Sequence, residues 1–480
     1  MSRLVIGPFN RVEGDLEVSL DLANGRVAAA YVSSPLYRGF EQILVDKPAL
    51  DALVFVPRIC GICSVAQSAA ASQALAAAMG VSPPANGRLA ANLVLATENI
   101  ADHLSHFYLF FMPDFARAEY AGRAWHEAAT ARFKAINGSA PRQWLPARAR
   151  LLQVMGVLAG KWPHTLALQP GGSSRPTRPA DTVRLFVLLR EFRAFLESTL
   201  FGDRLENVAA LDSFAALMAW AEQDGPAGAD FGRFLRIAGE LELWQLGRAV
   251  DRFLSYGAYD LEDENRLFAA GTWDGAFAAL DAAAISEDVS RAWLAGDSVR
   301  HPREGETRPR PDKEGAYTWC KAPRLDGRVV EVGALARQVV AGHPLARDLV
   351  VRFGGNVLAR VTMRLVEVAR LVPVMESWVR AIVDRAPFCL QSELAGDAEG
   401  VGLVEAARGS LGHWLSVRQG RIRNYQIIAP TTWNFSPRDA EGTPGALEQA
   451  LAGLAVPDGT PPTVYHIVRS FDPCMVCTVH

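Results

Sequence analysis

Four of the six cysteines form two Cys-x-x-Cys pairs that lie near opposite ends of the chain. Cys60 and Cys63 make the first pair, and Cys474 and Cys477 make the second. Two thiolates three residues apart can bind one ion, and two such pairs supply the four-sulfur ligand set that soft or borderline metals prefer. Because about 410 residues separate the pairs, only the tertiary fold can bring them together.

The spacing of these cysteines leaves the identity of the metal open. It favours a structural zinc site or an iron–sulfur centre, whereas a redox-active dithiol would leave one pair unexplained. A zinc tetrathiolate usually stabilises a small module, but 50% of these 480 residues are apolar and can form a large core unaided. Cys320 and Cys389 are isolated in the sequence, and we expect both to be packed, unreactive thiols.

Mainly helical segments must position the cysteines. Alternating apolar residues on either side of Asn24-Gly25 predict a β-hairpin within about the first 35 residues. Apolar spacing and a helix N-cap predict helices over 64–80, 93–111, 181–200, 232–256 and 343–385, and the polar stretch 301–315 indicates an exposed loop. We therefore expect a mainly α fold with small β elements. This fold would have a large helical-bundle core, an N-terminal β-hairpin and a metal site buried between the two Cys-x-x-Cys motifs.

Length and composition exclude several classes of protein. A chain of 480 residues could hold about three domains, but no repeat or long linker divides it, so we expect one domain over residues 1–480. The net charge of −3 argues against a nucleic-acid partner, which needs a concentrated basic surface. No apolar run approaches about 18 residues, so we expect no transmembrane segment. The N-terminus lacks the features of a signal peptide, and we expect a cytoplasmic protein unless a partner's signal exports it.

The residues around both cysteine pairs resemble those of a known family. Residues 58–63, Arg-Ile-Cys-Gly-Ile-Cys, and the chain end, Asp-Pro-Cys-x-x-Cys-x-x-His, resemble the paired signatures of nickel–iron hydrogenase large subunits. Segments 10–14, 38–41, 103–108 and 409–439 resemble further motifs of the same family. The likeness runs from residue 10 to residue 480, so it covers nearly the whole chain.

The resemblance implies a binuclear metal centre. All four cysteines would bind nickel, and Cys63 and Cys477 would also bridge to iron. The iron would carry carbon monoxide and cyanide ligands, and H2 would be the substrate. Iron–sulfur clusters would lie only in a partner, the small subunit of a heterodimer or of a dimer of heterodimers.

The resemblance also implies catalytic side chains around the metals. Arg408 would lie over the centre with its guanidinium toward one cyanide nitrogen, and Thr431 would donate to the other. Glu13 would relay a proton from a nickel thiolate. Asp114 and Asp472 would lie near the metals, with Asp472 pairing with Arg408 or capping the local turn. In the alternative, Arg408 forms a surface ion pair and Glu13 is an exposed carboxylate.

A magnesium site is a further implication of the resemblance. Glu41 and His480 match its two side chains, which suits an ion that prefers oxygen donors and retained waters. In the alternative, Glu41 forms an ion pair with Arg38. His103 and His106 lie on one helical face, and we expect them to be hydrogen-bonded packing residues rather than ligands.

Ile62 and Phe110 indicate a branch of the family. Many oxygen-sensitive members have valine and leucine at these positions, and the larger side chains would narrow the hydrophobic tunnel that carries gas to the metals. The regulatory branch restricts gas access in this way. We therefore expect an H2-sensing, oxygen-tolerant hydrogenase of low turnover that reports to a sensor histidine kinase. The alternative within the family is an energy-conserving uptake hydrogenase.

Two further alternatives lie outside the hydrogenases. A relative such as the quinone-binding subunit of respiratory complex I typically lacks the cysteine pairs, so the four cysteines argue against it. A zinc-stabilised binding protein would hold zinc without nickel or iron. The chain stops at His480, where most family members lose a C-terminal tail, so either a tail has been removed or the gene lacks one.

Overall fold

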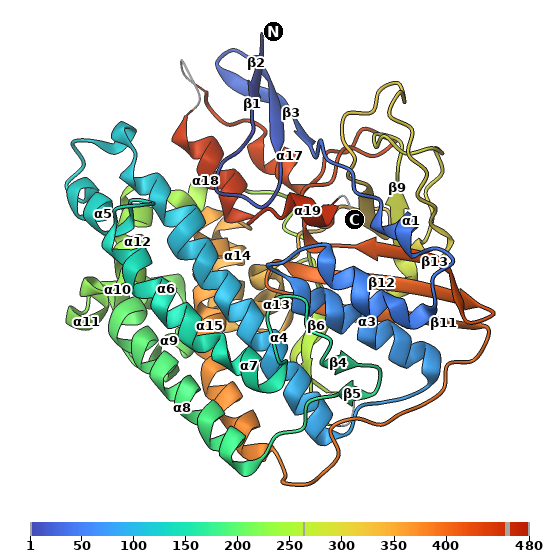
Figure 1. Ribbon diagram of the computed structural model, residues 1–480. Coiled ribbons are helices and arrows are strands. Elements are labelled where there is room, and N and C mark those ends of the chain that lie inside the picture. The colour runs from blue at the N-terminus through green and yellow to red at the C-terminus, as the bar shows by residue number, and fades with distance from the viewer. Residues whose placement is uncertain (1, 263–264, 457–460, 479–480) are drawn as a thin grey trace.

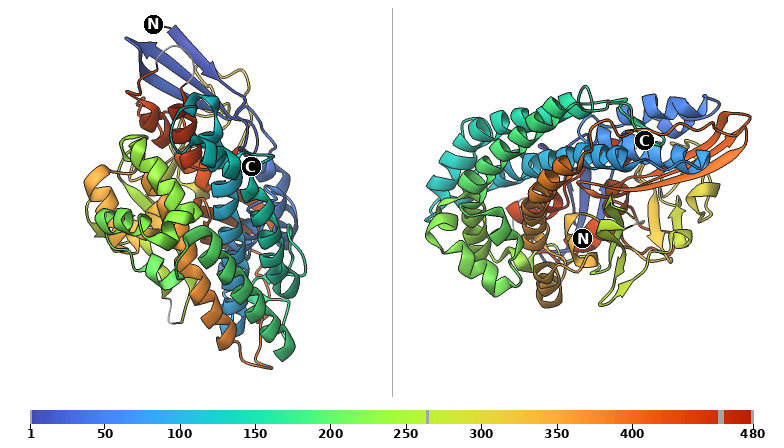
Figure 2. Two further views of the ribbon diagram at one scale, coloured as in Figure 1. Left: turned by 90° about the vertical axis from the view of Figure 1, so that its left-hand side faces the viewer. Right: turned by 90° about the horizontal axis from the view of Figure 1, so that it is seen from below.

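The fold is described by a computed structural model that covers residues 2–262, 265–456 and 461–478. Helices dominate these residues, and five small antiparallel sheets accompany them. Figure 1 shows most helices gathered on one side of the molecule and most strands on the other. Figure 2 shows the long helices running roughly side by side through the helical part.

The helical part is organised around two long helices, α4 and α15, which pack against each other. Of the 25 residues of α15, 19 are buried, so this helix is a central element of the core. The helices of this part are α4 (Ala85–Ser105), α5 (His126–Phe133), α6 (Ser139–Leu151), α7 (Gln153–Leu158), α8 (Pro179–Phe195), α9 (Leu205–Ala209), α10 (Phe214–Ala221), α11 (Asp224–Gly228), α12 (Asp230–Glu240), α13 (Ala334–Val340), α14 (Pro344–Phe353) and α15 (Val357–Ala381).

The second part consists of small sheets and the helices that connect them to the metal-binding motifs. Its strands are β1 (Ser2–Ile6), β2 (Glu17–Ala23) and β3 (Arg26–Ser33); β4 (Leu168–Gln169) and β5 (Gly172–Ser173); β6 (Phe253–Asp260), β7 (Arg266–Trp273) and β8 (Phe277–Ala278); β9 (Ile285–Asp288) and β10 (Ala322–Leu325); and β11 (Ala398–Ala406), β12 (Gly409–Arg418) and β13 (Arg421–Ile428). Its helices are α1 (Phe40–Leu44), α2 (Ala52–Phe55), α3 (Ser64–Met79), α16 (Pro430–Asn434), α17 (Ala446–Leu451), α18 (Pro462–Ser470) and α19 (Met475–Thr478).

The structure agrees with most of the predicted elements. The N-terminal hairpin is β2–β3, and β1 extends it to three strands. The predicted helix over 64–80 is α3, the one over 181–200 is α8 with a π-helical end, and 343–385 contains α14 and α15. The predicted mainly α fold class therefore fits the structure. The three-stranded sheets that contain β6 and β11 were not predicted, so the structure has more β-strand than expected.

The prediction of one helix over 232–256 is wrong in its second half. Helix α12 ends at Glu240, and residues from Phe253 form the buried strand β6. The loop expected over 301–315 is largely irregular, but its Lys313 is buried rather than exposed. The ammonium of Lys313 donates to three backbone carbonyl oxygens, those of Val289, Leu294 and Gly296, which satisfies it inside the loop.

Helix α3 lies directly on the backbone of strand β11. A Cβ on Gly400 would lie 1.9 Å from the carbonyl oxygen of Ala74, and one on Gly402 would lie 2.0 Å from that of Ala70. Only glycine allows such a close approach, and small alanines on α3 face the strand. This contact fixes α3, and with it the residue at its N-terminal end, Cys63.

The close approach at Gly402 predicts a large effect of one methyl group. Gly402→Ala should destabilise the protein by about 1–3 kcal/mol, because helix and strand must move apart. Thermal unfolding measured by circular dichroism checks this expectation. Gly396→Ala is the matched control, since nothing lies within 4 Å of its Cβ position. Equal midpoints for the two variants would contradict the packing argument.

No helix in the described part of the chain is long and apolar enough to cross a membrane.

Candidate metal centre

The two Cys-x-x-Cys pairs meet in the interior. Their four sulfur atoms lie within 4.8 Å of one another, and all four residues are buried. The Sγ–Sγ distances are 3.3 Å between Cys63 and Cys477, 3.5 Å between Cys60 and Cys474, and 3.0 Å between Cys474 and Cys477. The sequence prediction that the fold joins the pairs is therefore confirmed.

The local structure around each pair explains how the sulfurs converge. Cys60 and Cys63 lie in the turn that leads into α3, and Cys63 is the N-cap residue of that helix. Cys474 precedes α19, and Cys477 lies within it. Arg38 joins the two turns, because its guanidinium donates to the backbone carbonyl oxygens of Ile59 and Val476.

Glu98 on α4 binds the N-terminus of α3 and was not predicted from the sequence. Its carboxylate accepts hydrogen bonds from the backbone N–H groups of Val65 and Ala66, both at 2.9 Å, and from the Trp162 indole at 2.8 Å. An N-cap side chain ordinarily accepts these N–H groups. Because Glu98 accepts them instead, the sulfur of Cys63 keeps its lone pairs for a metal.

The electrostatics of the four sulfurs favour a bound cation. Hydrogen bonds from Cys474, Cys477 and Cys63 lower the pKa of Cys60 well below its ordinary value. Burial, by contrast, raises the pKa of Cys474 well above its ordinary value. Four thiolates this close cannot all be ionised out of water without a positive ion, so the donor set fits a soft or borderline metal.

Arg408 lies beside the sulfurs and is held in one orientation. Its guanidinium makes two hydrogen bonds with Asp102, of 2.5 and 3.1 Å, and one with Asp472, of 3.1 Å, while Nε donates to the Asp472 carbonyl oxygen. Burial opposes the charge, but Asp102 and Asp472 raise the pKa of Arg408 well above its ordinary value. The predicted Asp472–Arg408 pair is confirmed, and a surface ion pair is excluded because all three side chains are buried.

Asp102 was missed in the sequence, although it directly precedes His103. His103 and His106 are buried and hydrogen-bonded to Glu367 and to the Arg469 carbonyl oxygen, which confirms their predicted packing role. Thr431 accepts a hydrogen bond from the backbone N–H of Cys474, so it lies beside one of the four cysteines, and its expected donation to a cyanide nitrogen stays a prediction.

Glu13 also lies beside the sulfurs. Its backbone pairs with Cys474, and its carbonyl oxygen accepts from the N–H of Met475 at 2.7 Å. Burial and the neighbouring Cys60 sulfur raise the pKa of the half-buried Glu13 carboxyl. The alternative, in which Glu13 is an exposed carboxylate, is therefore wrong, because the side chain is half-buried.

Asp114 belongs to a cluster of arginines. Its carboxylate contacts Arg11, Arg117 and Arg469, and it is fully buried. Although burial opposes ionisation, Arg469 and the other cations hold the pKa of Asp114 below its ordinary value. His466 Nδ1 also lies 4.0 Å from this carboxylate. These contacts indicate a structural role, and the catalytic role expected for Asp114 stays a prediction.

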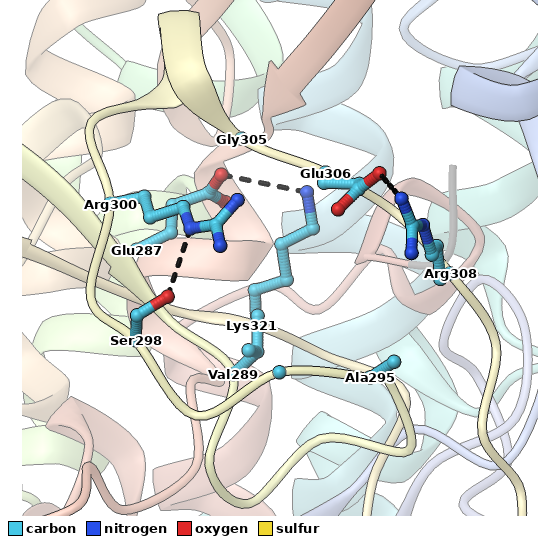
Figure 3. A pocket seen from close by; sticks show the side chains of 10 residues that line it. Glu287, Val289, Ala295, Ser298, Arg300, Gly305, Glu306, Arg308 and Lys321 are labelled. Atoms are coloured by element: carbon cyan, nitrogen blue, oxygen red, sulfur yellow. Dashed lines mark hydrogen bonds and ion pairs between the residues drawn. The ribbon is translucent and has the colours of Figure 1, made fainter.

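Glu41 lies in a buried group of oxygen atoms around Lys321. The Lys321 ammonium lies 3.0 Å from the Glu41 carboxylate, 3.5 Å from that of Glu287 and 2.7 Å from the Gln426 side-chain oxygen. A cavity of about 220 Å³ opens over Lys321 and Glu287, and Figure 3 shows these two side chains facing each other in it. The donors suit Mg²⁺ in type, and His480 lies outside the described residues.

The remaining predicted residues lie as follows. Ile62 is half-buried against the core between Cys60 and Cys63, and Phe110 is half-buried in the π-helical segment His106–Phe111 that follows α4. Cys320 is fully buried and its pKa is raised by burial, as expected of a packed thiol. Cys389 is only partly buried, so it is less closely packed than expected; its thiol donates to the carbonyl oxygen of Pro170.

Comparison with known proteins identifies the family. The model of the nickel-dependent hydrogenase family matches residues 38–143 and 141–480, so the chain belongs to this family of enzymes. It is 29% identical to the periplasmic NiFeSe hydrogenase large subunit of Desulfomicrobium baculatum, covering 100% of this chain and 95% of the relative. It is 28% identical to the uptake hydrogenase large subunit of Azotobacter chroococcum, again covering 100% of this chain and 95% of the relative.

The fold is likewise similar to solved hydrogenases. The reduced Ni-Fe-Se hydrogenase from Desulfovibrio vulgaris Hildenborough aligns with a TM-score of 0.84 and 29% identity over 100% of both chains. The likeness thus includes both the helical part and the sheets.

The burial of Glu98 predicts a pH dependence of stability. Burial raises the pKa of Glu98 to about 8. The folded protein then keeps a proton that the unfolded chain loses, so this group lowers the free energy of unfolding as the pH rises from about 5 to about 8. The side chain in Glu98→Gln cannot ionise. The free energy of unfolding of the wild type, relative to that of this variant, should therefore fall over this pH range.

Chemical denaturation of metal-free protein at several pH values measures this difference. Glu222→Gln, at an exposed position, is the control. A difference that stays constant or grows with pH would show that Glu98 is ionised in the folded protein.

Proposed function

We propose that the chain is the large subunit of an uptake hydrogenase that oxidises H2 at a nickel–iron centre and passes the electrons to an iron–sulfur small subunit. The observation that carries the proposal is the set of four buried sulfurs within 4.8 Å, with Arg408 beside them. The named relatives support it, since one of them is an uptake hydrogenase.

The centre would be held by the chain's own side chains. Cys60 and Cys474 would bind nickel alone, and Cys63 and Cys477 would bridge nickel and iron. Arg408 and Thr431 would face the carbon monoxide and cyanide ligands of the iron, since a guanidinium suits anionic nitrogen acceptors. When bound, this centre supplies the Lewis acidity and the electron acceptor for heterolytic cleavage of H2.

The protein's residues would handle the proton and exclude water. Glu13 is placed by its backbone pairing with Cys474, within reach of the sulfurs, and would accept the proton there. The apolar core around the cysteines keeps bulk water from the site. The four paired cysteines would bind nickel and iron, and Cys320 and Cys389 are isolated in the sequence. The electrons would therefore leave through iron–sulfur clusters in the small subunit.

A magnesium ion at Glu41 is part of the proposal. The oxygens of Glu41, Glu287 and Gln426 would supply donors or hold its waters, with His480 as the expected nitrogen ligand. The cytoplasmic location expected from the sequence stays a prediction, and one of the relatives is named periplasmic.

Replacement of one ligand tests the proposal. Cys474→Ser should lower bound nickel at least about tenfold and abolish H2-dependent dye reduction, because a hydroxyl is a poor ligand for a soft site. Elemental analysis and activity of the purified complex measure both. Cys389→Ser, which changes a thiol away from the centre, should alter neither. Zinc without nickel or iron in the wild-type protein would instead establish a zinc-binding protein.

A second candidate, the H2-sensing hydrogenase with a kinase partner, is favoured by one observation. Ile62 lies between two ligand cysteines and packs against the core, where its bulk would narrow gas access. A low turnover and a resting state that resists air would support this candidate over uptake.

Smaller side chains at the two gas-access positions separate these candidates. If the side chains restrict access, Ile62→Val with Phe110→Leu should speed inactivation by O2 at least about tenfold, because a wider tunnel admits the gas. The decay of H2 oxidation after an air pulse measures this rate. Ile136→Val with Phe277→Leu, both at exposed positions, is the matched control. An unchanged rate would remove the argument for the sensor.

A further inference from the structure

Arg408 and Asp102 form a buried pair although they come from unrelated segments. Arg408 lies in the turn between β11 and β12, and Asp102 lies on α4. Their two hydrogen bonds need the guanidinium and carboxylate planes to coincide. Since a long stretch of sequence separates them, a third group must set the position of the turn relative to the helix.

Arg337 on α13 contacts the turn immediately before Arg408. Its Nη1 donates to the carbonyl oxygen of Ala406 at 2.8 Å, and its Nη2 donates to that of Ala407 at 3.0 Å. The side chain is fully buried, with an exposed fraction of 0%. The turn that carries Arg408 is therefore fixed to one guanidinium.

The same guanidinium contacts two carboxylates. Nε and Nη2 of Arg337 donate to the two oxygens of Glu367, at 3.0 and 2.7 Å, and Nη1 donates to Glu405 at 2.8 Å. With the two carbonyl bonds, this makes five hydrogen bonds for the five N–H groups of an arginine. No other side chain offers five donors in one plane.

Glu367 continues the chain of contacts to α4. Its carboxylate also binds Nε2 of His103, at 3.0 Å, and His103 is the residue directly after Asp102. One buried pair, Arg337–Glu367, thus holds the neighbour of Arg408 on one side and the neighbour of Asp102 on the other. The carboxylate of Glu405 and the amide of Gln338 complete the group.

We propose that Arg337, acting through Glu367 and His103, is a positioning residue that aligns Arg408 with Asp102 over the metal centre. The inference rests on the proposed function, because it gives Arg408 a role at the reacting site. A buried ion pair is weak support for stability by itself, but its fixed geometry can specify one arrangement of the chain. Arg337 touches neither the cysteines nor Arg408's own side chain in the described contacts, so its effect must pass through the backbone and α4.

Arg337→Lys tests the proposal on the assembled enzyme. A lysine has three donors on one nitrogen and cannot bind Glu367 in two places while holding both carbonyls. We expect kcat to fall about 10- to 100-fold with an apparent KM for H2 within about threefold, since small misplacements of reacting groups are costly. Nickel content should stay at the wild-type level, and the infrared bands of the cyanide ligands should shift because Arg408 no longer faces them in the same way.

Two histidine variants keep the test decisive if Arg337→Lys fails to fold. His103→Gln retains a donor toward Glu367, so its turnover should stay within about threefold of wild type. His103→Leu removes that donor and should shift the cyanide bands in the same direction as Arg337→Lys. If both histidine variants match wild type, Glu367 does not transmit position to α4 and the proposal is wrong.

Arg132→Lys is the matched control for general destabilisation. Arg132 also makes two bonds to one buried carboxylate, that of Asp230, but the pair joins α5 to α12. It should lower the melting temperature and leave the cyanide bands and turnover unchanged. A nickel-loaded Arg337→Lys protein with unmoved bands, or equal band shifts in both lysine variants, would overturn the proposal. A wild-type protein without nickel would refute the proposed function instead.

Discussion

Crowding of four buried sulfur atoms is the constraint on which the surrounding structure depends. Residues near both ends of the chain bring these atoms within 4.8 Å, out of water. Ionised sulfurs so close repel one another, so the arrangement persists only with a cation and a rigid surround. The close packing of α3 on β11, and Glu98 at the N-terminus of α3, supply that rigidity on one side of the site.

Buried and partly buried arginines supply this rigidity elsewhere around the site. Arg38 joins the two cysteine turns, Arg408 joins α4 to the segment before Cys474, and Arg469 joins Asn10 to Asp114. Arg337 does the same for the turn that carries Arg408. Each buried guanidinium loses hydration, which its carboxylate and carbonyl partners offset. These arginines share one feature: each holds segments that are far apart in the sequence in a fixed arrangement. A binuclear metal site requires such fixed positions for its ligands.

The four cysteines can be predicted from the sequence, but only some of the side chains around them can. The cysteine pairs and the motif residues Glu13, Arg408 and Asp472 could be found because their spacing or resemblance is visible in one dimension. Glu98, Asp102 and Arg337 could not, since their roles arise from contacts between separate elements. The sequence predicts helix where strand β6 lies, because a short, fully buried apolar run has no periodicity that distinguishes strand from helix.

The identity of the metals bound to the four sulfurs tests the account most directly. Anomalous diffraction at the nickel and iron absorption edges from crystals of the purified complex would locate both ions. The account predicts nickel in contact with the sulfurs of Cys60, Cys63, Cys474 and Cys477, and iron in contact with those of Cys63 and Cys477 only. A single zinc ion within the four sulfurs, with no nickel or iron signal, would contradict it.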